Sequence, residues 1–315
     1  MKRLLLFLSL VSVLSGGLSA QVPAGKPAGQ DPQSSANQGP IKVRVELVNI
    51  LMTVSDKKGR LVTDLTKDDF KVFEDGKPQA IRFFSRETDL PLRVGLLIDT
   101  SNSIRDRLRF EQEAAVEFFS TTLRSGKDLG FVVSFDVEPQ LIQDYTDDVE
   151  KLSTALRSLQ AGGVTSLYDA IFFSCKEKML YFPPPEPYLR RVMIIISDGQ
   201  DNQSVHTREE ALGMAQRAEA TIFAISTNRS GAEGRGDKTL RRLADETGGR
   251  AFFPFEAGDL TSNFQEIARE LRSQYSVAYV STNPSHDGTF RNIDIQPVSK
   301  GLQVRSKNGY WAPTP

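Results

Sequence analysis

Short apolar runs alternate with amphipathic stretches from residue 93 onward, and this alternation constrains the fold more than any other feature. The runs RVGLLID (93–99) and RVMIIISD (191–198) are almost wholly apolar, as strands buried on both faces of a parallel sheet are. Stretches with helical spacing follow each of them, for example residues 107–123 and 207–220. This order predicts an α/β domain with a doubly wound, mostly parallel sheet covered by helices on both faces.

The segments on either side of this region have a different, β-rich pattern. Residues 41–90 and 274–315 contain alternating strands separated by turn signals such as Asp75-Gly76 and Asp287-Gly288. Because two isolated hairpins are only marginally stable in water, we expect these segments to pair in one small β-sandwich. The α/β domain, residues 91–273, would then be an insertion between its two halves.

The N-terminus has the pattern of an export signal. Lys2 and Arg3 precede an apolar run at residues 4–14 that is too short to span a bilayer, and small residues lead to a cleavage site after Ala20. We therefore expect residues 1–20 to be a signal peptide, with no transmembrane segment after its removal. Residues 21–40 are rich in Pro, Gly, Gln and Ser and are typical of a flexible linker. The expected location is the periplasm, the cell surface or the medium.

Charge and composition exclude several classes of site. The formal net charge is -1, which favours neither nucleic acid nor an anionic membrane as a partner. The chain has one cysteine, Cys175, and two histidines, so it can form no intrachain disulfide and no zinc site of the Cys- or His-rich kind.

Polar oxygen-bearing residues gather where the predicted strands end. Asp99, Ser101 and Ser103 follow the first buried strand, Asp198 follows a later one, and Thr165 precedes a predicted helix. In open α/β sheets, ligands bind at the carboxyl ends of the strands. Carboxylates and hydroxyls suit a hard cation, Mg²⁺, Mn²⁺ or Ca²⁺, and small hydroxyl-rich sites favour the smaller ions.

The charge of this ligand set indicates binding rather than catalysis. Two carboxylates balance a divalent ion, whereas hydroxyls are neutral and weak donors, so the ion keeps a position for an outside ligand. A partner protein that offers an Asp or Glu carboxylate would complete the coordination shell. The sequence thus predicts a metal-dependent adhesion module.

Three sequence motifs resemble one known site. D-x-S-x-S at 99–103, GGVTSLYDAI at 162–171 and IIISDG at 194–199 resemble the metal ion-dependent adhesion site (MIDAS) of von Willebrand factor A-type (VWFA) domains. The resemblance covers about residues 91–273. It implies a Rossmann-like sheet with one short antiparallel edge strand, for which residues 139–145 are the candidate.

The resemblance also implies roles for the five residues. Ser101, Ser103 and Thr165 match the hydroxyl ligands, and Asp99 and Asp198 match the acidic members, which often act through water. The flanks, with "DKKGRLVTDLTKDDFKVFEDGKPQ" and "KNGYWAP", resemble a bacterial exported subgroup of these proteins.

Two other functions compete with adhesion. A metal-dependent hydrolase with Asp99 as nucleophile would place a second Asp two residues later, where Ser101 stands, and no G-x-S-x-G elbow surrounds either serine. We therefore predict that the protein is not an enzyme. A structural cell-envelope protein that assembles with copies of itself, without metal-gated binding, remains open as the alternative.

Four further residues have simpler interpretations. Asp237 belongs to an Arg-Gly-Asp tripeptide, but we expect it to cap the following helix rather than to bind integrins. Cys175 lies in an apolar helical stretch and is predicted to be a buried, inert thiol. Asp169 is left out of the site, and His206 is expected to be solvated.

Overall fold

The computed structural model describes residues 47–87, 89–180, 189–228, 232–254 and 259–314. The predicted signal peptide and linker, residues 1–40, lie outside the described residues. No helix within the described ranges is long and apolar enough to cross a membrane. These residues form one six-stranded sheet and two four-stranded sheets.

The six-stranded sheet is the framework of the α/β domain. Its strand order is β10-β9-β8-β5-β6-β7, and all neighbours are parallel except β7, which pairs antiparallel with β6 at one edge. The bounds are β5 Leu92–Asp99, β6 Leu129–Phe135, β7 Pro139–Thr146, β8 Arg190–Ser197, β9 Ala220–Ser226 and β10 Ala251–Phe252. The predicted fold class is confirmed, including the antiparallel edge strand.

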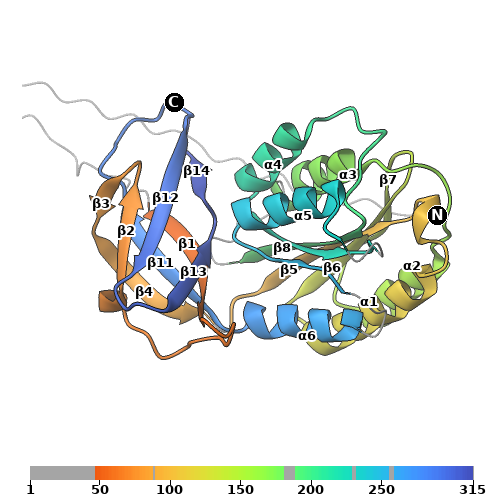
Figure 1. Cartoon of the computed structure of the whole chain (residues 1–315), viewed down its shortest axis with the longest axis horizontal. Helices are drawn as coiled ribbons and strands as arrows, with labels where there is room; N and C mark the ends of the chain where they lie inside the picture. The colour runs from red at the N-terminus through yellow and green to blue at the C-terminus, as the bar shows by residue number, and fades with distance from the viewer. Residues whose placement is uncertain (1–46, 88, 181–188, 229–231, 255–258, 315) are drawn as a thin grey trace, which may run out of the picture. The chain divides into compact units, whose positions relative to one another are not determined.

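Helices cover both faces of this sheet (Figure 1). One face carries α1 Leu108–Thr122, α2 Val149–Ser158 and α6 Asp259–Leu271, and the other carries α3 Leu167–Phe173, α4 Arg208–Arg217 and α5 Arg235–Glu246. Side chains of β5 alternate between the two cores: Leu96 packs with the first set of helices and Leu97 with the second. Burial on both faces explains why this strand is apolar throughout.

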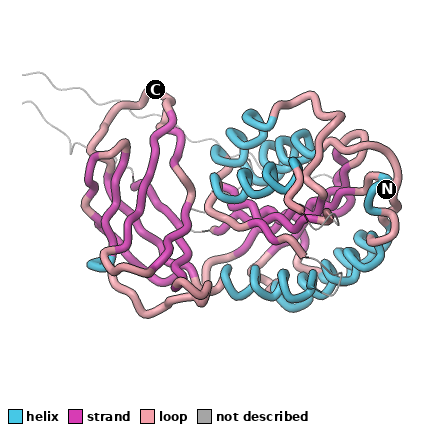
Figure 2. Tube along the Cα trace, viewed as in Figure 1, coloured by secondary structure: helices cyan, strands magenta, loops and turns pink. Residues whose placement is uncertain are grey.

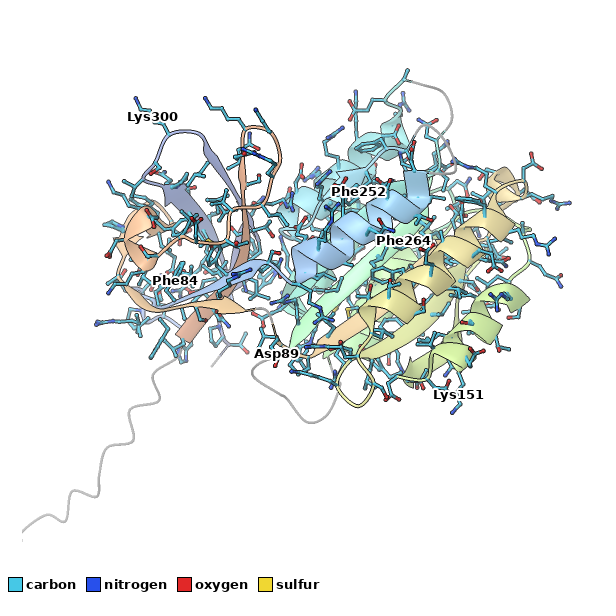
Figure 3. The ribbon with its side chains drawn as sticks, turned by 90° about the horizontal axis from the view of Figure 1, so that it is seen from below. Phe84, Asp89, Lys151, Phe252, Phe264 and Lys300 are labelled. Carbon is cyan, nitrogen blue, oxygen red and sulfur yellow. The ribbon has the colours of Figure 1, made fainter. Side chains whose placement is uncertain are left out.

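Aromatic packing joins two helices of the first face. The rings of Phe118 in α1 and Phe264 in α6 stack with centroids 5.0 Å apart, and Figure 3 shows Phe264 on the side of α6 that faces α1. Both side chains are almost fully buried. Such pairs add stability beyond the burial of their area.

Two helical segments differ from the sequence prediction. The predicted helix 166–180 changes after Phe173 into a π-helix, Ser174–Leu180. Helix α5 begins at Arg235 with Gly234 as its N-cap, so Asp237 caps this helix, as predicted, but not from the N-cap position. Asp237 is instead the third helical residue, and its carboxylate reaches back to accept the N–H of Gly234.

The two four-stranded sheets form the β-sandwich, with strand orders β13-β1-β11-β4 and β14-β12-β2-β3 (Figure 2). The bounds are β1 Leu47–Asp56, β2 Phe70–Glu74, β3 Lys77–Gln79, β4 Ile81–Glu87, β11 Gln274–Val280, β12 Phe290–Pro297, β13 Leu302–Ser306 and β14 Gly309–Trp311, with short 3₁₀ turns at Lys67–Asp69 and Asn102–Ile104. Strands from before and after the α/β domain alternate in the first sheet, and in the second the later strands β14 and β12 join the earlier strands β2 and β3 through the β12–β2 pair. A sandwich formed by N- and C-terminal strands was part of the predicted fold class.

Candidate metal centre

The ends of two adjacent strands bring the predicted acidic residues together. Strands β5 and β8 are parallel neighbours with Ile98 paired to Ile196, so the residues that follow them meet at one edge of the sheet. Asp99 ends β5 with no exposed surface, and Asp198 follows β8 and is half-buried. The negative charge of Asp198 acts on Asp99.

Backbone hydrogen bonds bring the third loop to the same place. The N–H of Gly162 donates to the carbonyl of Thr100 at 2.7 Å, and the N–H of Asn102 donates to the carbonyl of Gly163 at 3.3 Å. These bonds hold the loop before α3 against the residues that follow Asp99. The three sequence motifs therefore converge, as the carboxyl-end rule predicts.

Thr165 is fixed through its main chain while its hydroxyl stays available. Its N–H donates to Oδ1 of Asn202 at 3.1 Å, and its carbonyl accepts the N–H groups of Asn202 and Gln203. Among the described residues, none hydrogen-bonds to Oγ1 of Thr165. Asn202, which the sequence reasoning missed, thus ties the loop after Asp198 to the loop before α3.

The carboxylate of Asp99 is held at both oxygens. Oδ1 accepts the N–H of Ser101 at 2.9 Å, and Oδ2 accepts the hydroxyl of Ser197 at 2.7 Å. Burial raises the pKa of Asp99 above its usual 3.8, and although the bonds from Ser101 and Ser197 act to lower the pKa, the nearby charge of Asp198 adds to the increase. Ser197 lies within the IIISDG motif, but the sequence analysis gave it no role, because hydroxyls at strand ends are common.

The serine hydroxyls lie next to each other. Oγ of Ser101 and Oγ of Ser103 are 2.9 Å apart. Ser101 is only 3% exposed, whereas Ser103 lies at the surface. Asp99 is buried and Ser103 is exposed, so the centre meets solvent at Ser103.

Two glycines allow α5 to approach Asp198 closely. Gly199 has a φ of 74°, and a Cβ atom there would lie 2.3 Å from the carbonyl oxygen of Gly236. A Cβ atom on Gly236 would lie 2.0 Å from the carbonyl oxygen of Asp198. Only glycine fits at this crossing, which sets the position of the loop that carries Asp198.

A polar network next to the centre involves two residues that we had left out. The carboxylate of Asp169 accepts the N–H groups of Val205 and His206 and lies 2.6 Å from Nδ1 of His206, whose ring stacks on Phe172. Partial burial acts to raise the pKa of Asp169, but these hydrogen bonds outweigh it and the pKa is lowered. The prediction that His206 is simply solvated was wrong, and Asp169 anchors the loop after Asp198 to α3.

The donor set of the five residues fits a hard divalent cation. It consists of two carboxylates and three hydroxyls, all oxygen donors, with one carboxylate buried beside a second negative charge. A bound cation would offset both charges. Within the described ranges no three Asp, Glu, His or Cys side chains form a metal cluster, but a site with two carboxylates and three hydroxyls does not need one.

Comparison with known proteins gives the same family as the motifs. The family model of the von Willebrand factor type A domain matches residues 94–200. No curated protein matches the chain. The solved structure of a von Willebrand factor type A protein from Catenulispora acidiphila is similar, with 14% sequence identity and a TM-score of 0.50 over 77% of this chain and 73% of that chain.

Other similar structures come from quite different sources. Proximal thread matrix protein 1 from the mussel byssus, solved with a zinc-occupied MIDAS motif, has 16% identity and a TM-score of 0.50 over 62% of this chain and 49% of that chain. An aerotolerance-related membrane protein from Bacteroides fragilis has 16% identity and a TM-score of 0.46 over 57% of this chain and 98% of its own. At these identities the likenesses show the fold alone. Residues 94–200 thus match the family model of the von Willebrand factor type A domain, and the α/β domain has a fold similar to that of the Catenulispora acidiphila protein.

Proposed function

We propose that the chain is an exported protein-binding module whose grip depends on a divalent metal ion. Asp99, Ser101, Ser103, Thr165 and Asp198 hold the ion, with Mg²⁺ favoured over Mn²⁺ or Ca²⁺. An Asp or Glu carboxylate of a partner protein completes the coordination. The observation that carries the proposal is the buried Asp99 carboxylate, fixed at both oxygens beneath a cluster of hydroxyls and beside Asp198.

Electrostatics support a cation at this position. A buried carboxylate with a second acid close by is costly in the absence of a counter-charge, and the bonds from Ser101 and Ser197 offset only part of that cost. When bound, the ion supplies an electrophilic position for a carboxylate on the open side, next to Ser103. The byssus protein, whose MIDAS motif holds zinc, has the same fold and gives independent support.

The proposal includes the organisation of the chain. Residues 1–20 direct export and 21–40 form a tether, while 41–90 and 274–315 form the sandwich around the binding domain, 91–273. We propose no catalytic activity, because neither a second Asp two residues after Asp99 nor a nucleophile elbow is present. The alternative is a cell-envelope assembly protein whose contacts do not depend on metal.

Calorimetric titration of Mg²⁺ and Mn²⁺ into the purified protein tests the proposal. We expect saturable binding to the wild type and its loss in Asp99→Ala. Asp106→Ala is the matched control, because Asp106 is an exposed carboxylate a few residues away. Absence of saturable binding in the wild type would contradict the proposal. An assembly state that is unchanged by chelator in sedimentation would then favour the assembly alternative.

A further inference from the structure

A hollow opens directly beside the proposed metal centre. Its volume is about 540 Å³, and two of the five proposed ligands, Ser103 and Asp198, line it. Arg107, at the start of α1, and Arg235, at the start of α5, also line it. A group bound to the ion would therefore have two guanidinium groups within the same cavity.

Arg107 is the most informative residue of this hollow. Its side chain is only 6% exposed, and its Nη1 donates to the carbonyl of Thr227 at 2.9 Å. Nε is buried without a hydrogen-bond partner, and the buried carboxylate of Glu111 follows one turn later on the same helix. An unsatisfied buried guanidinium N–H is costly, so this position favours an added acceptor such as the carboxylate of a ligand.

The start of α5 adds to the positive potential of the hollow. The first N–H groups of a helix have no partner within the helix, and they favour anions. Gly236 lines the hollow in the first turn of this twelve-residue helix. Asp237 offsets part of this potential, because its buried carboxylate accepts the N–H of Gly234 as well as the hydroxyl of Ser226 and the side-chain amide of Asn228, so the cationic side chains of the hollow are Arg107 and Arg235.

In the Arg-Gly-Asp tripeptide, the accessible residue is Arg235 and not Asp237. Asp237 is 3% exposed and fully engaged in hydrogen bonds, so the tripeptide does not present an accessible carboxylate to another protein. Arg235 is exposed and lines the hollow. The part of the tripeptide that a partner meets is therefore its cation.

We propose that this hollow is an anion subsite that binds a second carboxylate of the partner segment whose first carboxylate completes the metal shell. The inference rests on the proposed function and makes it more specific: the partner is an acidic peptide segment with two closely spaced carboxylates. Arg107 forms the buried end of the subsite, and Arg235 and the N-terminus of α5 form its rim. Guanidinium–carboxylate hydrogen bonds are among the strongest that side chains make.

The test uses short capped peptides at a saturating concentration of Mn²⁺. One set has two glutamates separated by one or two glycines, and the matched set has one glutamate replaced by glutamine. Calorimetry of the wild-type protein should give about tenfold tighter binding for the diacidic peptide, the size expected of one charge-assisted hydrogen-bonded pair. A diacidic peptide with phosphoserine in place of the second glutamate shows whether the subsite prefers a dianion.

Substitutions of the two arginines test whether the preference for the diacidic peptide arises at the anion subsite. We expect Arg107→Gln and Arg235→Gln each to remove most of the tenfold preference while Mn²⁺ affinity is retained. Arg109→Gln is the control, because Arg109 is exposed on the same helix but does not line the hollow. Arg235 is exposed, so its variant tests the proposal even if Arg107→Gln fails to fold.

The outcomes separate this inference from the proposed function. Normal Mn²⁺ binding with equal affinity for the two peptide sets, or a preference that survives in both arginine variants, would overturn only the anion subsite. Failure of the wild type to bind Mn²⁺ would overturn the proposed function and, with it, this inference.

Discussion

The hydroxyl of Ser197 donates a 2.7 Å hydrogen bond to Oδ2 of Asp99 and so joins the last residues of two neighbouring parallel strands. Both residues are fully buried. Because the N–H of Ser101 holds the other carboxylate oxygen, the orientation of Asp99 is set by the fold. Such preorganisation lowers the cost of binding an ion.

Replacement of Ser197 tests this relationship. We expect Ser197→Ala to lower the free energy of unfolding by about 1–3 kcal/mol, because it leaves a buried carboxylate oxygen without its donor. Mn²⁺ affinity should fall as well, since Asp99 loses its fixed orientation. Urea unfolding and calorimetry measure the two effects. Ser153→Ala, which removes a buried hydroxyl in α2, should leave Mn²⁺ affinity unchanged.

The pH dependence of stability should reveal the raised pKa of Asp99. Since burial raises this pKa above 3.8, the folded metal-free protein holds the proton more tightly than the unfolded chain. The contribution of Asp99 to stability is therefore greatest below pH 3.8 and is lost as the pH rises through the folded-state pKa. Metal affinity follows the opposite trend and increases with pH, because the ion competes with the proton.

Asp99→Asn tests directly whether the ionised Asp99 carboxylate destabilises the metal-free protein. At neutral pH we expect the metal-free variant to be more stable than the metal-free wild type, because it removes a buried charge, while Mn²⁺ binding is lost. Thermal unfolding with chelator and with Mn²⁺ measures both. A variant that is less stable than the wild type under chelator would show that Asp99 is satisfied without an ion.

The glycine crossing beside Asp198 predicts a strong effect of one methyl group. We expect Gly236→Ala to weaken Mn²⁺ binding and to reduce stability, because the new Cβ would lie 2.0 Å from the carbonyl oxygen of Asp198. Gly213→Ala is the control within α4, because a Cβ there would lie 4.0 Å from Cζ2 of Trp311 and would meet no closer side chain. That change should stabilise the protein by about 0.5–1 kcal/mol.

A buried ion pair stabilises the sandwich. Glu74 and Arg291 are each 2% exposed and lie 3.5 Å apart, and the hydroxyls of Tyr279 and Tyr310 donate to Glu74. Burial, and then the contact with Glu74, raises the pKa of Tyr310 to about 12. Glu74 therefore interacts with side chains from three other strands, β11, β12 and β14.

Removal of this glutamate should be strongly destabilising. We expect Glu74→Ala to cost about 3–5 kcal/mol in urea unfolding, because it leaves Arg291 with only the more exposed Asp287, 3.8 Å away, as a counter-charge and removes the acceptor of two buried tyrosine hydroxyls. Glu113→Gln breaks an exposed pair with Arg157 and should change stability little. Equal stability of the two variants would show that the buried pair is replaceable.

Much of the site could be predicted because it depends on local sequence and on one topological rule. The apolar runs end at polar residues, so the end of β5 at Asp99 could be placed to the residue and that of β8 at Ser197 to within one residue. Parallel strands direct their following loops to one edge of the sheet, which was enough to expect Asp198 and Thr165 near Asp99. The antiparallel edge strand and the pairing of the flanking β segments followed from the same patterns and from the family resemblance.

The remaining features depend on contacts between distant segments. The crossing of Gly199 with Gly236 joins residues on separate loops, and a Gly after an Asp is otherwise a common turn signal. Arg107 stands in the sequence where an exposed charged residue at the start of a helix is expected, and only the fold shows that it is buried. The contact between Asp169 and His206 likewise required knowledge of how α3 meets the loop after Asp198.

The most direct test of the account is a crystal structure of the protein grown with Mn²⁺, with data collected at the manganese absorption edge. The account predicts one anomalous peak within bonding distance of the hydroxyls of Ser101, Ser103 and Thr165, with Asp99 and Asp198 bound directly or through water. No peak there, at a Mn²⁺ concentration that saturates calorimetric binding, or a peak elsewhere on the surface, would contradict it.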